Sequence, residues 1–239
     1  MISTEEQKKL VGKYAIKSLI SEKKIVSGSK IGMGTGTTIE YVIDVLADFV
    51  KSGELKDIAI VPTSSATLLK CEQLDLPIFS LNSKRIAGRL DISIDGADRI
   101  DEKKNLIKGG GAALLQEKII AYNSDEFVVV ADESKEVKSL VCDFPIPVEI
   151  IPSAYYPIVL ALQKKGMSVK LREGKGKIGP VVTDSGHHIL DVNYSSDLSI
   201  NPQIEELELN KIVGVVENGF FTKTDIVFIA KKDGKVICY

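Results

Sequence analysis

Three carboxylates and one lysine lie within a short, glycine-rich stretch in the middle of the chain. The segment Asp95–Asp98 is followed ten residues later by Lys108–Gly111 and then by Glu117. Carboxylates accept and release protons, and an ammonium group beside glycine amides stabilises negative charge as it develops. The pattern therefore predicts a site for proton-transfer chemistry.

A second glycine-rich run, Gly32-Met-Gly-Thr-Gly-Thr-Thr38, lies between a strand pattern and a helical pattern. Its third glycine comes one residue too early for a dinucleotide fingerprint, and no lysine follows it as an ATP-binding P-loop requires. A monophosphate cradle of amides and hydroxyls at a helix start remains, formed by Thr35, Gly36, Thr37 and Thr38. The alternative is a glycine turn with threonine helix caps.

Glu117 is expected on a helix over about 111–123, where its neighbours one turn away are Ala113, Leu114, Ile120 and Ala121. A carboxylate within an apolar stripe is costly unless it has a function. Partial burial would raise its pKa toward neutrality and suit it to act as a general base. A structural glutamate paired with a lysine is the alternative.

Asp95 and Asp98 follow the strand pattern 90–94, and ligands gather at strand carboxyl ends in open α/β sheets. An Asx turn and a magnesium site are the alternatives for these two carboxylates. Asp101 and Glu102, just beyond them, are expected on the solvated surface. For Lys108 the alternative is an exposed loop lysine.

The composition narrows the class of protein. The 239 residues are 44% hydrophobic, and Lys+Arg 31 against Asp+Glu 33 gives a net charge of -2. Without a basic run we expect no nucleic-acid partner, and without an apolar stretch of about 20 residues we expect no membrane partner. The widely spaced Cys71, Cys142 and Cys238 fit a reducing compartment, so we expect a cytoplasmic protein. His187 and His188 are neighbours in a turn, an unusual geometry for a metal site.

Strand and helix patterns alternate in the first half of the chain. A capping box at Ser3–Glu6 predicts an N-terminal helix. The fold class expected is α/β, with a doubly wound, mostly parallel Rossmann-like sheet and a second, smaller α+β domain. The predicted domains are 1–140 plus 219–239, and 141–218. The predicted strands are 29–33, 57–61, 77–81, 90–95, 127–131, 147–151, 167–172, 188–193, 213–216 and 225–230. The predicted helices after the first are 37–51, 64–74, 111–123, 158–164 and 201–210.

Five motifs in order make the chain resemble the ribose-5-phosphate isomerase A family. They are Gly-x-Gly-Thr-Gly-Thr-Thr, Asp-Gly-Ala-Asp, Lys-Gly-Gly-Gly-Ala-Ala followed by Glu117-Lys-Ile-Ile, Ala131-Asp-Glu-Ser-Lys135, and Phe144-Pro-Ile-Pro-Val-Glu-Ile-Ile-Pro152. Shorter matches at Val182–Gly186 and Ile189–Val192 extend the likeness through nearly the whole chain.

The resemblance implies interconversion of D-ribose 5-phosphate and D-ribulose 5-phosphate in the pentose phosphate pathway, without metal or cofactor, by a homo-oligomer that is commonly a dimer. It implies Glu117 as the proton acceptor, with Asp95, Asp98 and Lys108 as further catalytic residues. Lys8 is a further candidate for the phosphate. The implied substrate-binding residues are Thr35, Gly36, Thr37, Thr38, Asp95, Gly96, Ala97, Asp98, Lys108, Gly109, Gly110, Gly111 and Lys135.

Two departures and two alternatives remain. Arg99 stands where the family usually has an acidic residue, and Thr37 replaces the commoner serine. Arg99 could depress the pKa of Asp98 or point to solvent. One alternative function is a non-catalytic sugar-phosphate sensor, which would not need Glu117 and Lys108 together. The other is an amino-sugar phosphate deaminase, which would want a histidine in its site.

Overall fold

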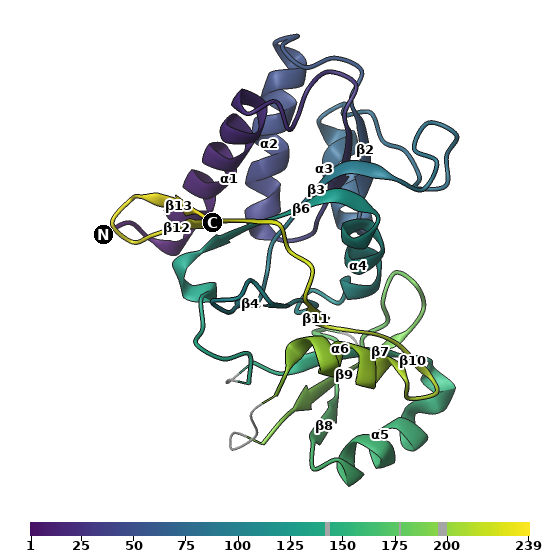
Figure 1. Cartoon of the computed structure of the whole chain (residues 1–239). Helices are drawn as coiled ribbons and strands as arrows, with labels where there is room; N and C mark the ends of the chain where they lie inside the picture. The colour runs from purple at the N-terminus through teal and green to yellow at the C-terminus, as the bar shows by residue number, and fades with distance from the viewer. Residues whose placement is uncertain (142–143, 177, 196–199) are drawn as a thin grey trace. The chain divides into compact units, whose positions relative to one another are not determined.

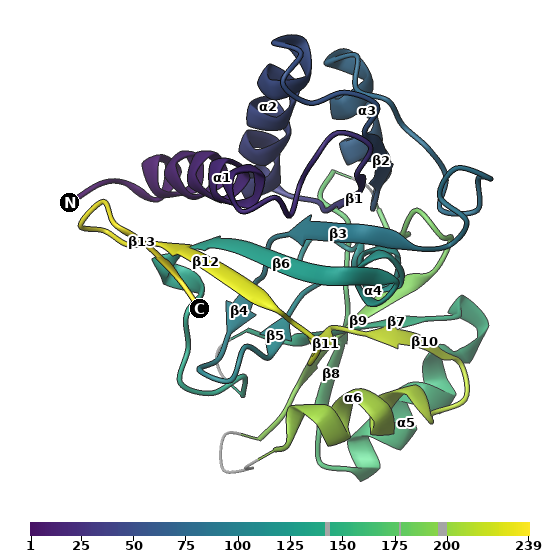
Figure 2. The same ribbon diagram turned by 45° about the horizontal axis from the view of Figure 1, so that its top comes forward.

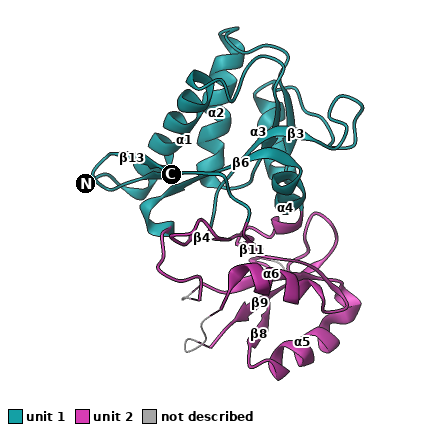
Figure 3. Ribbon diagram, viewed as in Figure 1, with its two compact units in different colours: residues 1–97, 116–135, 223–239 teal, residues 98–115, 136–222 magenta. Residues whose placement is uncertain are grey.

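The computed structural model describes residues 1–141, 144–176, 178–195 and 200–239. Cys142 lies outside these residues. Within them the chain divides into two compact units, shown separately coloured in Figure 3. Unit 1 comprises residues 1–97, 116–135 and 223–239, and unit 2 comprises residues 98–115 and 136–222. Each unit is described by itself.

Unit 1 is built on a mostly parallel sheet. In the described residues it has six strands in the order β13-β12-β6-β3-β1-β2, and only β13 runs antiparallel to its neighbour. The strands are β1 (Lys30–Met33), β2 (Ala59–Pro62), β3 (Leu90–Asp95), β6 (Ser124–Asp132), β12 (Ile226–Ala230) and β13 (Val236–Cys238). Because β2 lies on one side of β1 and β3 on the other, the strand order reverses at β1. Ligands bind at such a switch point in open α/β sheets.

Helices cover both faces of this sheet (Figure 2). On one face α1 (Thr4–Ser21), α2 (Thr37–Lys51) and α3 (Ser65–Gln73) pack over the large core, and α4 (Leu114–Tyr122) packs on the other face through Ile120. The helix α1 begins at the predicted capping box, in which Ser3 and Glu6 bond each other's backbone amides. The doubly wound α/β fold is therefore confirmed.

Unit 2 contains a four-stranded antiparallel sheet, among the residues described, in the order β10-β7-β9-β8. Its strands are β7 (Ile146–Ile150), β8 (Ser168–Leu171), β9 (His188–Asn193) and β10 (Val215–Asn218). Figure 1 labels the helices α5 (Tyr155–Lys164) and α6 (Pro202–Asn210) of this unit. They share one core with Val148, Leu190 and Val192. Side chains alternate along a strand, so Pro147 and Asp191, paired between β7 and β9, point to the face opposite α5 and α6.

A further sheet in the described part of unit 2 consists of three short strands, in the order β11-β5-β4. They are β4 (Arg99–Ile100), β5 (Leu106–Ile107) and β11 (Phe220–Phe221). Short 3-10 turns occur at η1 (Glu133–Lys135) and η2 (Pro152–Ala154).

The predicted strand at 77–81 is wrong, because Ile78 makes only an isolated bridge to Ile60. Leu76 and Pro77 form a connection at the edge of the sheet, and proline has no amide hydrogen to donate to a ladder. The short strands β4, β5 and β11 were not predicted. The predicted helix at 111–123 begins later, at Leu114, since Ala112 has a φ of 60° that no helix accepts.

Candidate active site

The candidate phosphate cradle lies at the switch point of unit 1, directly after β1. Gly36 is the N-cap of α2, with a φ of 123° that favours glycine, and Thr37 and Thr38 are the first helical residues. Gly36 and Thr37 are exposed, so their amides sit at the positive end of an accessible helix. Lys8 of α1 donates from Nζ to Thr37 Oγ1 over 2.9 Å, which adds an ammonium group to the cradle.

Asp95 is buried at the end of β3, the strand next to β1, and holds the start of the cradle. Its Oδ1 accepts the amide of Thr35 over 3.1 Å and that of Gly96 over 2.7 Å. A Cβ on Gly34 would lie 2.0 Å from this oxygen, so the approach requires glycine. The candidate acid and the cradle are therefore one hydrogen bond apart.

A cluster of hydroxyl groups supports Thr35 from the other side. Thr35 donates from Oγ1 to Ser64 over 2.7 Å and lies 2.8 Å from the hydroxyl of Thr63. Thr67 donates to the carbonyl of Gly34 over 2.7 Å. Ser64 is also the N-cap of α3. The contacts of Thr35 thus hold the loop in place, whereas Thr37 and Thr38 supply the candidate phosphate contacts.

Glu117 is buried in the first turn of α4, with 5% of its surface exposed. Its helical neighbours Ile120 and Ala121 are also buried, as the apolar stripe predicted. The first turn of a helix stabilises a carboxylate, because backbone amides point toward it. Lys118, the next residue, is buried and lies with Nζ 5.8 Å from the ring centroid of Tyr122.

Lys135 ends the turn η1, directly after β6. Asp132 shapes this turn, since its Oδ1 accepts the amide of Ser134 over 3.0 Å and the hydroxyl over 2.5 Å. Gln7 of α1, the residue before Lys8, accepts the amide of Glu133 over 3.3 Å. Within unit 1 the α1 segment that carries Lys8 therefore lies beside the Lys135 turn.

Unit 2 contains the other candidate residues. Lys108 is buried; its amide donates to the carbonyl of Gly219 over 2.9 Å, and its Nζ lies 5.5 Å from the ring centroid of Phe221. Asp98 accepts the amide of Gly110 through Oδ2 over 2.7 Å. This bond joins the Asp95–Asp98 motif to the glycine loop.

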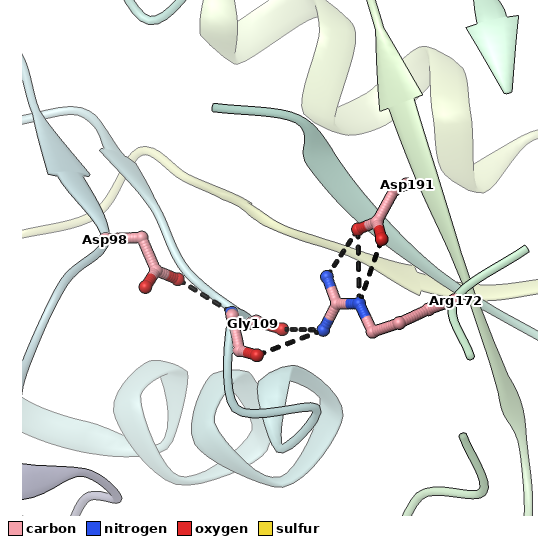
Figure 4. A network of polar contacts seen from close by, with 5 residues as sticks. Asp98, Gly109, Arg172 and Asp191 are labelled. Carbon is pink, nitrogen blue, oxygen red and sulfur yellow. Dashed lines mark hydrogen bonds and ion pairs between the residues drawn. The ribbon is translucent and has the colours of Figure 1, made fainter. Parts of the chain in front are cut away.

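A residue that the sequence reasoning missed holds the same loop. Arg172, just after β8, donates from Nη1 to the carbonyls of Gly109 and Gly110 over 2.7 and 3.2 Å (Figure 4). Its other nitrogens bind the carboxylate of Asp191. More than sixty residues separate Arg172 from the loop, and no local pattern signals such a contact.

Arg99 does not simply extend into solvent. Its guanidinium lies 4.9 Å from the ring centroid of Phe144, and Nη1 donates to the backbone carbonyl of Asp98 over 2.7 Å. Arg99 thus contributes to the local backbone structure at Asp98.

Two searches concern other kinds of site. Among the described residues no group of three or more His, Cys, Asp or Glu side chains could hold a metal ion. No helix in the same part of the chain is long and apolar enough to cross a membrane.

Comparison with known proteins points in one direction. A sequence model of the family described as "Ribose 5-phosphate isomerase A (phosphoriboisomerase A)" matches residues 59–234. Ribose-5-phosphate isomerase A of Treponema denticola is 55% identical over 236 residues, covering 98% of this chain and 99% of that protein. The solved structure of ribose 5-phosphate isomerase A from Methanocaldococcus jannaschii matches with a TM-score of 0.88 at 41% identity, covering 98% of this chain and 99% of that one. A D-ribose-5-phosphate isomerase solved in complex with phospho-erythronic acid matches with a TM-score of 0.91 at 40% identity, covering 100% and 99%.

Proposed function

We propose, because the chain belongs to the ribose-5-phosphate isomerase A family, that it interconverts D-ribose 5-phosphate and D-ribulose 5-phosphate. The observation that carries the proposal is the direct bond between the cradle and a buried carboxylate, Thr35 N–H to Asp95. A phosphate-binding loop and an acid are thereby fixed at one switch point. This is the arrangement that a phosphorylated sugar undergoing proton transfer needs.

In this proposal the phosphate binds to the amides and hydroxyls of Thr37 and Thr38, with Gly36 giving access and Lys8 adding charge. Thr35 holds the loop in place. Lys135, in the turn beside the Lys8 segment, is a second ammonium group for the substrate.

Glu117 is the proposed base. It removes the proton from C2 of the open-chain aldose, electrons move to form the C1–C2 double bond of an enediolate, and the same carboxylic acid returns the proton at C1. Negative charge on the two sugar oxygens is stabilised by the Lys108 ammonium and by amides of the Gly109–Gly111 loop. Asp95 or Asp98 transfers the hydroxyl proton and assists opening of the sugar ring. Gly96 and Ala97, between these two aspartates, are proposed to contact the substrate. No metal or cofactor takes part in the proposed steps.

The proposal extends to the setting of the enzyme. The reaction belongs to the non-oxidative branch of the pentose phosphate pathway, in the cytoplasm, and the active form is a homodimer. Tyr156 and Leu160, one turn apart on α5, are exposed apolar side chains that a second copy could cover. Light scattering during size-exclusion chromatography measures the mass of the assembly directly.

The deaminase alternative has less support in the structure. His187 binds the buried carboxylate of Glu149 through Nδ1 over 2.9 Å, and His188 belongs to strand β9. Both histidines have structural positions in unit 2, away in sequence from every proposed site residue. The proposed division into domains, 1–140 plus 219–239 and 141–218, concerns independent folding and is tested by expressing residues 141–218 alone.

The test of function is conversion of ribose 5-phosphate to ketose by purified protein in EDTA. We expect turnover that EDTA does not reduce. Binding of ribose 5-phosphate without turnover would favour the sensor function over the isomerase function. Turnover that EDTA abolishes would refute the metal-free mechanism.

A further inference from the structure

Arg172 links two parts of unit 2 that the proposed mechanism does not otherwise connect. Nε and Nη2 bind both oxygens of Asp191 on the sheet face opposite α5 and α6, and Nη1 reaches two consecutive carbonyls of the glycine loop (Figure 4). The side chains of Arg172 and Asp191 are only 15% and 20% exposed. Such an ion pair is less screened by water than a surface pair.

The direction of the peptide bonds gives this contact a consequence for the site. In a planar trans peptide the carbonyl and the following amide point opposite ways. Since Arg172 binds the carbonyl of Gly109, the amide of Gly110 points away from it, and Asp98 accepts that amide over 2.7 Å. Arg172 and Asp98 therefore hold opposite ends of one peptide group. By the same reasoning the Gly111 amide points away from Arg172.

The glycine loop has the close backbone approach that its contacts with Arg172 and Asp98 require. Gly109 has a φ of 102°, and a Cβ there would lie 2.7 Å from Leu114 Cδ2 and 3.1 Å from Pro147 Cβ. A Cβ on Gly110 would lie 2.6 Å from Asp98 Oδ1. Side chains are thus excluded at both positions, and the backbone lies close to Pro147 of the sheet and to Asp98.

Only an arginine can make all of these contacts at once. Its planar fork offers five donors in fixed directions, whereas a lysine offers one compact ammonium group. The guanidinium also places positive charge at the negative ends of two peptide dipoles. At the opposite ends of these peptides the Gly110 amide binds the Asp98 carboxylate, and the Gly111 amide can stabilise an anion.

We propose that Arg172, oriented by Asp191, is a positioning residue for isomerisation. It fixes the peptides of Gly109–Gly111 so that their amides, and the Asp98 carboxylate bonded to one of them, are arranged before the enediolate forms. The inference rests on the proposed function. It predicts a loss in the chemical step, because a misplaced donor loses transition-state stabilisation more than substrate binding.

The test compares Arg172→Lys with Arg85→Lys. Arg85 also donates to backbone carbonyls, those of Asp57 and Ile58 in unit 1, and lies over the Phe79 ring. We expect Arg172→Lys to lower kcat about 10- to 100-fold with a change in KM of less than about 3-fold, the scale of a misplaced catalytic group. Arg85→Lys should leave kcat unchanged. In Arg172→Ala, added guanidinium at millimolar concentration should restore part of kcat, and sodium chloride at equal ionic strength should not.

Hydrogen exchange at the Gly110 amide supplies a readout that does not depend on activity. We expect faster exchange there in Arg172→Lys and in Asp191→Asn, with unchanged exchange in the strands of unit 1. If Arg172→Lys fails to fold, Asp191→Asn carries the test alone. Wild-type kcat and wild-type exchange in either folded variant would overturn the inference. An inactive wild type would refute the proposed function instead, and the exchange experiment would still decide whether Arg172 orders the loop.

Discussion

Gly34→Ala should destabilise the protein through one residue, Asp95. The new Cβ would lie 2.0 Å from Asp95 Oδ1, 2.1 Å from Cγ and 2.7 Å from Cα. Ordinary contact begins at 3.4 Å, so the carboxylate must move by about 1.4 Å. Since the Asp95 backbone belongs to β3, rotation of the side chain alone cannot relieve the overlap with Cα.

The size of the effect follows from what is lost. Overpacking costs about 1–3 kcal/mol, and each amide bond to the carboxylate, from Thr35 and Gly96, contributes about 1.5–3 kcal/mol. The terms overlap, and alanine stabilises by about 0.4–1 kcal/mol through the unfolded chain. We expect a decrease of about 3–5 kcal/mol in the free energy of unfolding. At about 2–4 °C per kcal/mol, Tm should fall by about 6–20 °C.

The assay is thermal unfolding followed by far-ultraviolet circular dichroism, since the chain has no tryptophan. Gly111→Ala is the stability control, because a Cβ there meets no atom within 4 Å and the backbone is not in the left-handed region. Its Tm should change by less than about 2 °C, the scale of an ordinary surface substitution. A Gly34→Ala Tm equal to that of the wild type would refute the close approach of Asp95 to the cradle.

Three further perturbations test other parts of the structure. Lys8→Met should raise KM for ribose 5-phosphate about 10-fold with a smaller effect on kcat, because the lost ammonium binds substrate and transition state alike. Steady-state kinetics measure both constants, with Lys9→Met as the control. Burial raises the pKa of the Cys71 thiol to about 11, so below that pH the reactive thiolate is scarce. After alkylation at pH 8, peptide mapping should find the exposed Cys238 modified and Cys71 protected. Equal labelling of the two cysteines would contradict the buried position of Cys71. Ser3→Ala should cost about 0.5–2 kcal/mol by removing the capping box, measured by denaturant unfolding, whereas Ser153→Ala, at an exposed serine outside α1, should cost less.

Elements with strong local signals were predictable from the sequence. The helix α2 has the predicted bounds, 37–51, because it begins at a glycine N-cap and carries a clear apolar stripe. Strand β3 ends at Asp95 as expected. The placement of Thr35 and Asp95 at the carboxyl ends of strands was expected from parallel sheets in general, whereas the pairing of β1 with β3 came only with the structure.

What the sequence could not show depends on contacts between distant residues. The two-residue strand β11 pairs with β5 through Phe220 and Ile107, more than one hundred positions apart, and so short a strand has no periodicity. Arg172 ends a strand pattern like any polar residue, and only the folded sheet places it against Gly109 and Gly110. The hydrogen bond from the Thr35 amide to Asp95 was equally unpredictable from the sequence, because the two residues lie sixty positions apart.

The central claim is that Glu117 moves the proton between C2 and C1, and Glu117→Gln tests it most directly. Turnover of ribose 5-phosphate is measured in EDTA beside the wild type and Glu102→Gln, which removes an exposed carboxylate instead. Calorimetric titration with ribose 5-phosphate checks that Glu117→Gln still binds the substrate. We predict that Glu117→Gln binds this compound but turns over about 10²–10⁴ times more slowly, the scale of a lost general base, whereas Glu102→Gln matches the wild type. Near-normal turnover by Glu117→Gln would contradict the mechanism.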